Sequence, residues 1–175
     1  MNLYLLHNDY YRTRRGLEST TQNCISEVGR AILSYVDKYG KYPDKENWYD
    51  VIVNDNESVK KYFYYLGGLE KKQLNIALNE NLSNLTPTEL SKNTILLIEA
   101  TGPWNFTGSK ELLDTERQKD EYYPDRDKFI FIYFVDSILA KYRICDGAIA
   151  LYNPDEKSFS KWQTKGETNY SPLKW

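Results

Sequence analysis

The sequence predicts an α+β domain in which an N-terminal amphipathic helix packs on an antiparallel β-sheet. Two observations indicate this class: apolar residues recur at helical steps before Gly40, and short apolar runs separated by turn residues follow Thr94. No linker rich in Pro, Gly or Ser divides the 175 residues, so we expect one domain over 1–175. A chain of this length buries about 70% of its unfolded surface, which makes a core possible without metals or disulfides.

The main helix is predicted over residues 17–39, and residues 1–16 are predicted to be an arm or the start of that helix. Gly40 and Pro43 supply a strong stop signal. Glu27 and Arg30 lie three residues apart on the polar face and can pair. The opposite face should pack on the sheet, and it comprises Cys24, Ile25, Val28, Ile32, Tyr35 and Tyr39.

Residues 44–91 are predicted to hold short helices and a loop. Trp48 and Tyr49 open one apolar segment, and Ser58 to Tyr65 forms a second that ends before Gly67. The stretch from Leu69 to Ser91 is rich in Asn, and its apolar residues show no clear period. We therefore expect a loop with short extended or helical pieces there.

The antiparallel sheet is predicted over residues 94–175, with a charged insertion at 112–127. Ile95–Glu99 is a short apolar run, and Phe129–Val135 is the most hydrophobic stretch, which predicts a central strand. Leu139–Ile144 and Ala148–Tyr152 should follow as neighbours, joined by a tight turn at Asp146-Gly147. Ser158 to Trp162 is expected to extend this meander.

The composition excludes several classes of function. The 23 basic and 25 acidic residues give a net charge of −2, whereas nucleic-acid binders usually carry a basic excess. The single histidine, His7, excludes most metal sites and most imidazole catalysis. The high content of Tyr, 16 residues, is typical of hydrated surfaces that contact other molecules. We therefore expect a binding or structural protein that is not an enzyme and needs no cofactor.

Three alternatives remain open from the residues. Trp104 and Trp162, with surface Tyr, could form a platform that stacks on carbohydrates or another ligand. Glu99 and Asp136 could be the carboxylate pair of a small hydrolase, if their strands are neighbours. The acidic residues of the 112–127 insertion could bind Ca²⁺, although we favour a solvated loop, because interleaved basic residues compete for the carboxylates.

The two cysteines, Cys24 and Cys145, lie far apart and match no metal-binding spacing. They are either two buried thiols or a single disulfide that closes a long loop. The disulfide would require an oxidising compartment.

The stretch from Gln22 to Pro43 resembles the helix end of type IV pilin-like proteins and type II secretion pseudopilins. The matching positions are Cys24, Gly29, Ala31, Tyr35, Tyr42 and Pro43, followed by the aromatic pair Trp48-Tyr49. In the C-terminal half, Ile95–Glu99, Gly102-Pro103-Trp104-Asn105 and Phe129–Asp136 are similar in order to a subset of that family. That subset has Asp-Gly where this chain has Asp136-Ser137, and a His where Arg126 stands.

The resemblance implies a pilin-like head: a non-catalytic structural or interaction domain of the bacterial cell envelope, involved in fibre assembly or secretion. Other pilin-like subunits or secretion-system proteins would be its partners, with glycans as the alternative. The family's basic leader and apolar N-terminal helix do not match this chain, so we expect membrane contact only through such a missing helix. The implied location is extracytoplasmic, or cytoplasmic if Met1 is the true start.

Overall fold

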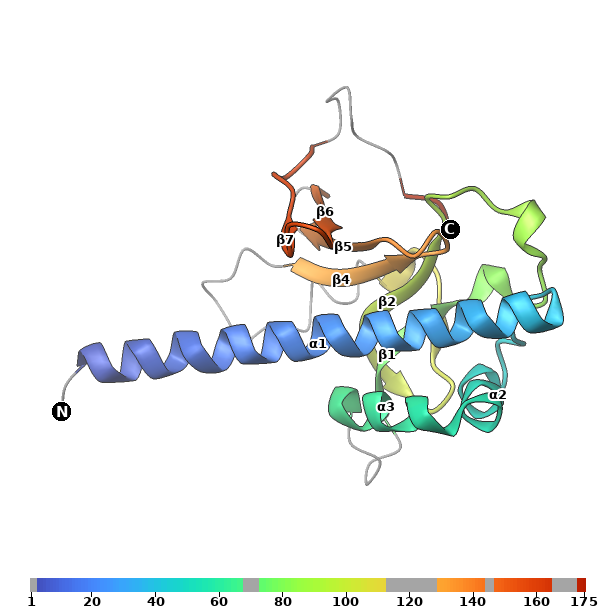
Figure 1. Ribbon diagram of the computed structural model, residues 1–175, viewed down its shortest axis with the longest axis horizontal. Coiled ribbons are helices and arrows are strands. Elements are labelled where there is room, and N and C mark those ends of the chain that lie inside the picture. The colour runs from blue at the N-terminus through green and yellow to red at the C-terminus, as the bar shows by residue number, and fades with distance from the viewer. Residues whose placement is uncertain (1–2, 68–72, 113–128, 144–146, 165–172) are drawn as a thin grey trace.

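The computed structural model describes residues 3–67, 73–112, 129–143, 147–164 and 173–175. It confirms the α+β class: a long N-terminal helix and two short helices lie against a sheet that is mostly antiparallel (Figure 1). Over the described residues the sheet has seven strands in the order β3-β1-β2-β4-β5-β6-β7. β1 and β3 pair in parallel, and the other neighbouring strands pair antiparallel.

Helix α1 spans Leu3–Tyr39, so the helix includes the segment that the sequence left as an arm or a helix start. Its 37 residues make it roughly 55 Å long. The C-terminal half lies across the sheet, whereas the N-terminal half extends beyond it (Figure 1). The predicted stop is confirmed: Gly40 adopts a φ of +74°, and its N–H donates to the Val36 carbonyl at 2.7 Å.

Helix α2 (Trp48–Asp55) and helix α3 (Lys60–Gly67) lie on the same side of the sheet as α1, and the 3₁₀ turn η1 (Glu57–Val59) joins them. Trp48, Tyr49 and Phe63 pack their rings together there, each 2% exposed or less. The indole N–H of Trp48 donates to the Phe106 carbonyl at 3.1 Å, which ties α2 to the sheet edge.

The strands are β1 (Gln73–Asn79), β2 (Ile95–Pro103), β3 (Thr107–Gly108), β4 (Phe129–Phe134), β5 (Leu139–Arg143), β6 (Ile149–Asn153) and β7 (Ser158–Phe159). β4 is a central strand, as predicted, and it is buried on both faces. Phe131 and Tyr133 face the helices, whereas Ile130, Ile132 and Phe134 join a second apolar cluster on the opposite face. This two-sided burial explains its continuous apolar sequence.

The main difference from the prediction concerns β1, a full strand in the stretch predicted to be a loop with short extended or helical pieces. β1 pairs antiparallel with β2, and Ile76 and Leu78 are 1% exposed or less. Asn79 ends the strand and is fully buried: its amide donates to the Ile95 carbonyl at 2.9 Å, and its side-chain oxygen accepts from the Asn81 N–H at 3.1 Å. The Asn-rich composition concealed this strand, although the side chain of one of these residues, Asn79, makes the hydrogen bonds at the strand's end. Turns η3 (Glu80–Leu82) and η4 (Pro87–Glu89) follow it.

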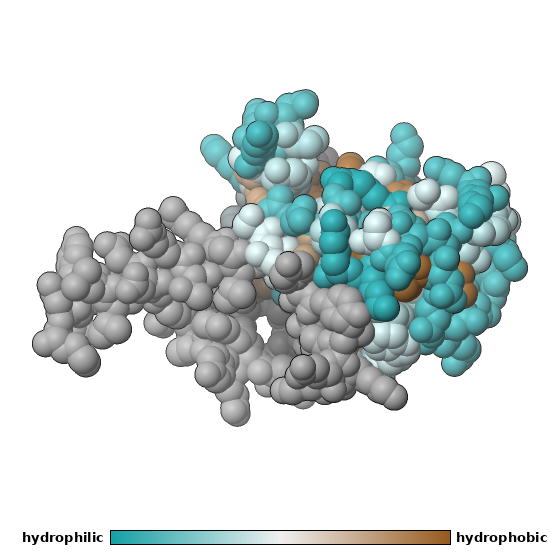
Figure 2. Space-filling view, turned by 60° about the horizontal axis from the view of Figure 1, so that its bottom comes forward, coloured by the Kyte–Doolittle hydropathy of each residue, from teal (hydrophilic) through white to brown (hydrophobic). Residues whose placement is uncertain are grey.

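Apolar residues of the described part lie mainly inside the molecule. The face in Figure 2 is largely hydrophilic over the residues that are coloured, with only small hydrophobic areas. Among the described residues, the exposed large hydrophobic side chains are Tyr39 and Ile138.

Candidate functional site

The candidate site is the helix seat, which we define as the buried face of α1 around Gly29 together with the β4 surface beneath it. A Cβ atom on Gly29 would lie 2.4 Å from the ring carbons of Tyr133, far inside van der Waals contact. Tyr133 is 2% exposed, and this burial raises the pKa of its hydroxyl. Only a glycine allows the helix backbone to approach β4 this closely.

The predicted packing face forms most of the helix seat. Cys24, Ile25, Val28 and Ile32 are at most 1% exposed, and Tyr35 is half-buried. The prediction is wrong at Tyr39, which is 49% exposed because its hydroxyl reaches Asp55 on α2. The predicted Glu27–Arg30 pair is present on the outer face.

Cys24 packs as a small apolar side chain, and within the described part of the chain its thiol is free. Burial, followed by the nearby Glu27 carboxylate, raises the pKa of this thiol, which keeps it protonated. Cys145 lies outside the described residues, so the pairing of the two cysteines stays a prediction.

Lys141 of β5 fixes α1 near the point where the helix leaves the sheet. Its ammonium lies 3.6 Å from the Glu18 carboxylate of α1. The same ammonium lies 4.2 Å from the ring centre of Phe129, 4.6 Å from that of Phe159 and 5.7 Å from that of Phe131. Because Lys141 is only 18% exposed, these contacts are less screened than surface pairs.

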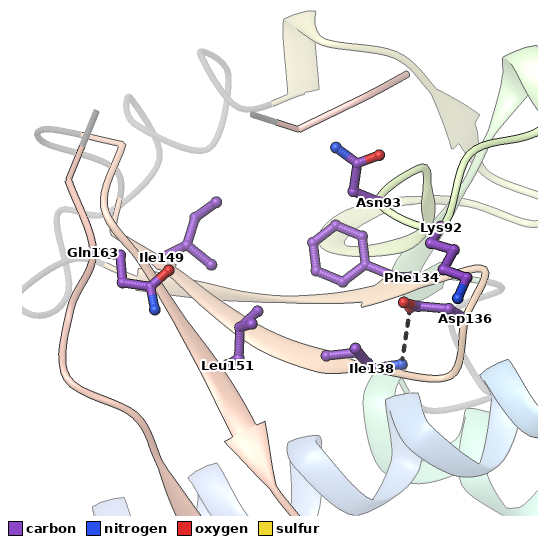
Figure 3. Close-up of a pocket in the computed structure, with 8 residues that line it drawn as sticks. All are labelled: Lys92, Asn93, Phe134, Asp136, Ile138, Ile149, Leu151 and Gln163. Atoms are coloured by element: carbon purple, nitrogen blue, oxygen red, sulfur yellow. Dashed lines mark hydrogen bonds between the residues drawn. The ribbon is translucent and has the colours of Figure 1, made fainter. Parts of the chain in front are cut away.

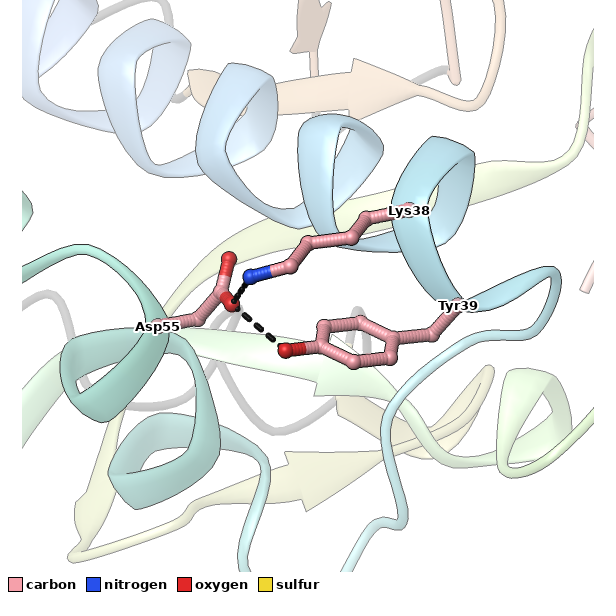
Figure 4. A network of polar contacts seen from close by, with 3 residues as sticks. All are labelled: Lys38, Tyr39 and Asp55. Carbon is pink, nitrogen blue, oxygen red and sulfur yellow. Dashed lines mark hydrogen bonds and ion pairs between the residues drawn. The ribbon is translucent and has the colours of Figure 1, made fainter.

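Asp55 holds the other end of α1. It accepts hydrogen bonds from the Lys38 ammonium at 2.5 Å and from the Tyr39 hydroxyl at 2.8 Å (Figure 4). These bonds lower the pKa of Asp55 and raise that of Lys38. α1 is thus fixed to the sheet through Lys141 and to α2 through Asp55.

Trp104 and Trp162, the predicted ligand-contact aromatics, are half-buried and pack against different elements. The indole N–H of Trp104 donates to Asp50 at 3.0 Å, and its ring centre lies 3.8 Å from that of Tyr49 on α2. The Trp162 ring lies 4.8 Å from the Arg143 guanidinium of β5. The structure therefore does not bring the two indoles together as one platform.

Glu99 and Asp136 are also separated by the fold. The Glu99 carboxylate accepts the Phe131 N–H at 3.0 Å, near the start of β4. Asp136 lies beyond the other end of β4, in the turn to β5, where it accepts the Ile138 N–H at 3.4 Å. The neighbouring Ser137 has a φ of +70°, a conformation that glycine adopts most easily.

The acidic insertion lies almost entirely outside the described residues, since 113–128 are among those that the structure leaves undescribed. Its calcium-binding role therefore stays a prediction. Among the residues that are described, no group of three or more His, Cys, Asp or Glu is arranged to hold a metal ion.

Comparison with known proteins finds no family model, curated protein or solved structure that matches this chain. Within the described residues, α1 and the other helices lack an apolar stretch that is long enough to cross a membrane. The helix seat thus has to be interpreted from its own geometry. Neither Lys141–Glu18 nor Lys38–Asp55 follows a sequence motif, so sequence reasoning missed both.

Proposed function

We propose that this chain is a non-catalytic, pilin- or pseudopilin-like structural or interaction domain of the bacterial cell envelope, which takes part in fibre assembly or secretion. The observation that carries the proposal is the division of α1 into two halves. One half is buried on an antiparallel sheet, and the other extends beyond it (Figure 1). The resemblance of Gln22–Pro43 to the helix end of pilin-like proteins supports the same interpretation.

The sequence of the extended half of α1 predicts an apolar stripe that suits a helical partner. Leu3, Leu6, Tyr10 and Leu17 recur at steps of three, four and seven residues, which places them on one helix face. Residues 3–17 add roughly 22 Å of helix beyond the packed half. Helices in proteins gain most of their stability from packing of an apolar face rather than from propensity. Such a face is therefore suited to packing against other helices.

The anchored half is suited to carry load from that contact. The Lys141–Glu18 pair fixes α1 next to its extended half. The helix seat holds the middle of the helix, and Asp55 fixes its C-terminal end. A force applied to the extended half therefore reaches the sheet through several independent contacts. This arrangement fits a subunit of an assembly.

The contacts of the aromatic and acidic residues favour this proposal over its alternatives. Trp104 packs on Tyr49 and Trp162 lies beneath Arg143, so both rings take part in internal packing. Glu99 and Asp136 each accept a backbone N–H at opposite ends of β4. A glycan platform needs open ring faces, and a hydrolase needs carboxylates about 5–10 Å apart in one cleft.

Two matched variants test the proposal in the organism that encodes the chain. An epitope inserted between Asp155 and Glu156, in the exposed turn after β6, allows detection by cell fractionation. We expect the tagged protein in the envelope and in sheared or secreted high-mass material. Leu6→Glu/Tyr10→Glu should remove it from that material, at least tenfold, because two charges enter the apolar stripe.

The control for that experiment is Asn8→Glu/Tyr11→Glu, which adds the same charge outside the stripe: Asn8 lies roughly opposite it, and Tyr11 lies about 100° around the helix from Tyr10. It should leave the distribution unchanged. A tagged protein confined to the cytosol, or equal effects of the two double variants, would contradict the proposal.

A further inference from the structure

A cavity of about 210 Å³ lies on the face of the sheet opposite α1, at the turn between β4 and β5 (Figure 3). Phe134 and Ile149, which are 5% and 4% exposed, form part of its floor. Leu151 extends the floor along β6, and Ile138 lies at the mouth with 36% exposure. The interior of the cavity is therefore apolar, and its opening is bordered by an exposed apolar side chain.

The rim of the cavity carries both signs of charge. Lys92 and Asp136 lie together at one end of it, and the Gln163 amide lies at the other end, beside Ile149 (Figure 3). The Asp136 carboxylate is oriented by its turn, since it accepts the Ile138 N–H at 3.4 Å.

Backbone pairing holds the Lys92 end of the rim in place. Lys174 next to the C-terminus donates its N–H to the Asn93 carbonyl at 3.2 Å, and its carbonyl accepts the Ile95 N–H at 2.9 Å. These two hydrogen bonds hold the residues that directly follow Lys92 against the Lys174 backbone. The charged end of the cavity has a defined position relative to its apolar floor.

We propose that this cavity binds a free amino acid with a large apolar side chain, such as phenylalanine. The ligand's ammonium would meet Asp136 and its carboxylate Lys92, while its side chain lies over Phe134 toward Ile149 and Leu151. An acid and a base at one end of an apolar cavity match a zwitterionic head group better than a ligand with a single charge. Small-molecule sites combine an apolar lining with a few polar groups in this way.

The amino acid site does not depend on the proposed assembly role of α1. The cavity lies on the other face of the sheet from the helix seat, and none of its lining residues belongs to α1. A subunit of an assembly and a protein of any other role could carry such a site equally well.

Titration of the purified full chain, followed by amide NMR, tests the proposal with four probes. Phenylalanine should bind with a dissociation constant of roughly 0.1–1 mM. It should shift the amide signals of Phe134, Ile149 and Leu151. 3-Phenylpropionate and phenethylamine, which each keep one charge, should bind about three- to tenfold more weakly. N-Acetylphenylalanine amide, which resembles a peptide residue, should bind more weakly than either. Equal binding of this amide and phenylalanine, or no shift of those signals, would overturn the proposal.

Variants of the rim connect the binding to the cavity. Lys92→Met and Asp136→Asn should each weaken phenylalanine binding about three- to tenfold, and the new Asn oxygen can still accept the Ile138 N–H. Ile138→Trp should block the mouth. Lys45→Met, an exposed lysine outside the cavity, is the matched control and should bind like the parent. If Lys92→Met and Asp136→Asn both bind phenylalanine as tightly as the parent protein, the site is excluded. This conclusion holds whether or not Ile138→Trp folds.

Discussion

Gly29→Ala is expected to lower the free energy of unfolding by about 2–3 kcal/mol, although alanine favours a helix over glycine by about 1 kcal/mol. The new methyl group would lie 2.4 Å from ring carbons of Tyr133, which is buried and has little room to move. Either the helix must rise from the sheet or the tyrosine must leave its rotamer. Urea denaturation followed by circular dichroism measures the change.

Two controls separate this clash from a general effect of helix substitutions. Ser34→Ala lies on the exposed face of the same helix and should change stability by less than about 0.5 kcal/mol. Combining Gly29→Ala with Tyr133→Leu should recover part of the loss, because the contacting ring is removed. If Gly29→Ala stabilises the protein as its helix propensity alone predicts, the close approach of α1 to β4 is wrong.

Trp48→Ala should cost about 3–5 kcal/mol, the largest effect that we expect from a single substitution. Trp48 is fully buried, its ring centre lies 5.8 Å from that of Phe63, and it donates to the Phe106 carbonyl at 3.1 Å. The substitution removes both the apolar volume and the hydrogen bond that ties α2 to the sheet edge. Thermal and urea unfolding of the variant measure the loss.

Trp48→Phe is the matched variant for that position. It keeps an aromatic ring against Phe63 but leaves the Phe106 carbonyl without its indole donor, which should cost about 1–3 kcal/mol. The order of stability should therefore be parent, Trp48→Phe, Trp48→Ala. A loss of less than about 1 kcal/mol for Trp48→Ala would show that α2 does not pack as described.

The parts of the fold that follow local rules were predictable from the sequence. The helical period from Cys24 to Val36 and the stop at Gly40 identified the packed half of α1 and its end. The apolar run of β4 indicated a central strand, because only burial on both faces favours such a composition.

Other features depend on contacts that no local pattern encodes. The Ile76–Asn79 part of β1 is buried but lies in an Asn-rich stretch, and the Asn79 side chain makes the hydrogen bonds at the end of the strand. Lys141 meets Glu18, and Lys38 meets Asp55, only after the chain has folded. Tyr39 follows the helical period of the apolar face. Its hydroxyl nevertheless donates a hydrogen bond to Asp55, and the residue stays exposed.

Photocrosslinking from the extended half of α1 tests the assembly role most directly. Benzoylphenylalanine is placed at Tyr10, on the apolar stripe, or at Tyr11, about 100° around the helix from Tyr10, in cells that encode the chain. We predict crosslinks from position 10 to helices of small pilin-like subunits, and several-fold fewer from position 11. Equal crosslinking from both positions, or crosslinks only to proteins unrelated to a fibre or secretion system, would contradict the account.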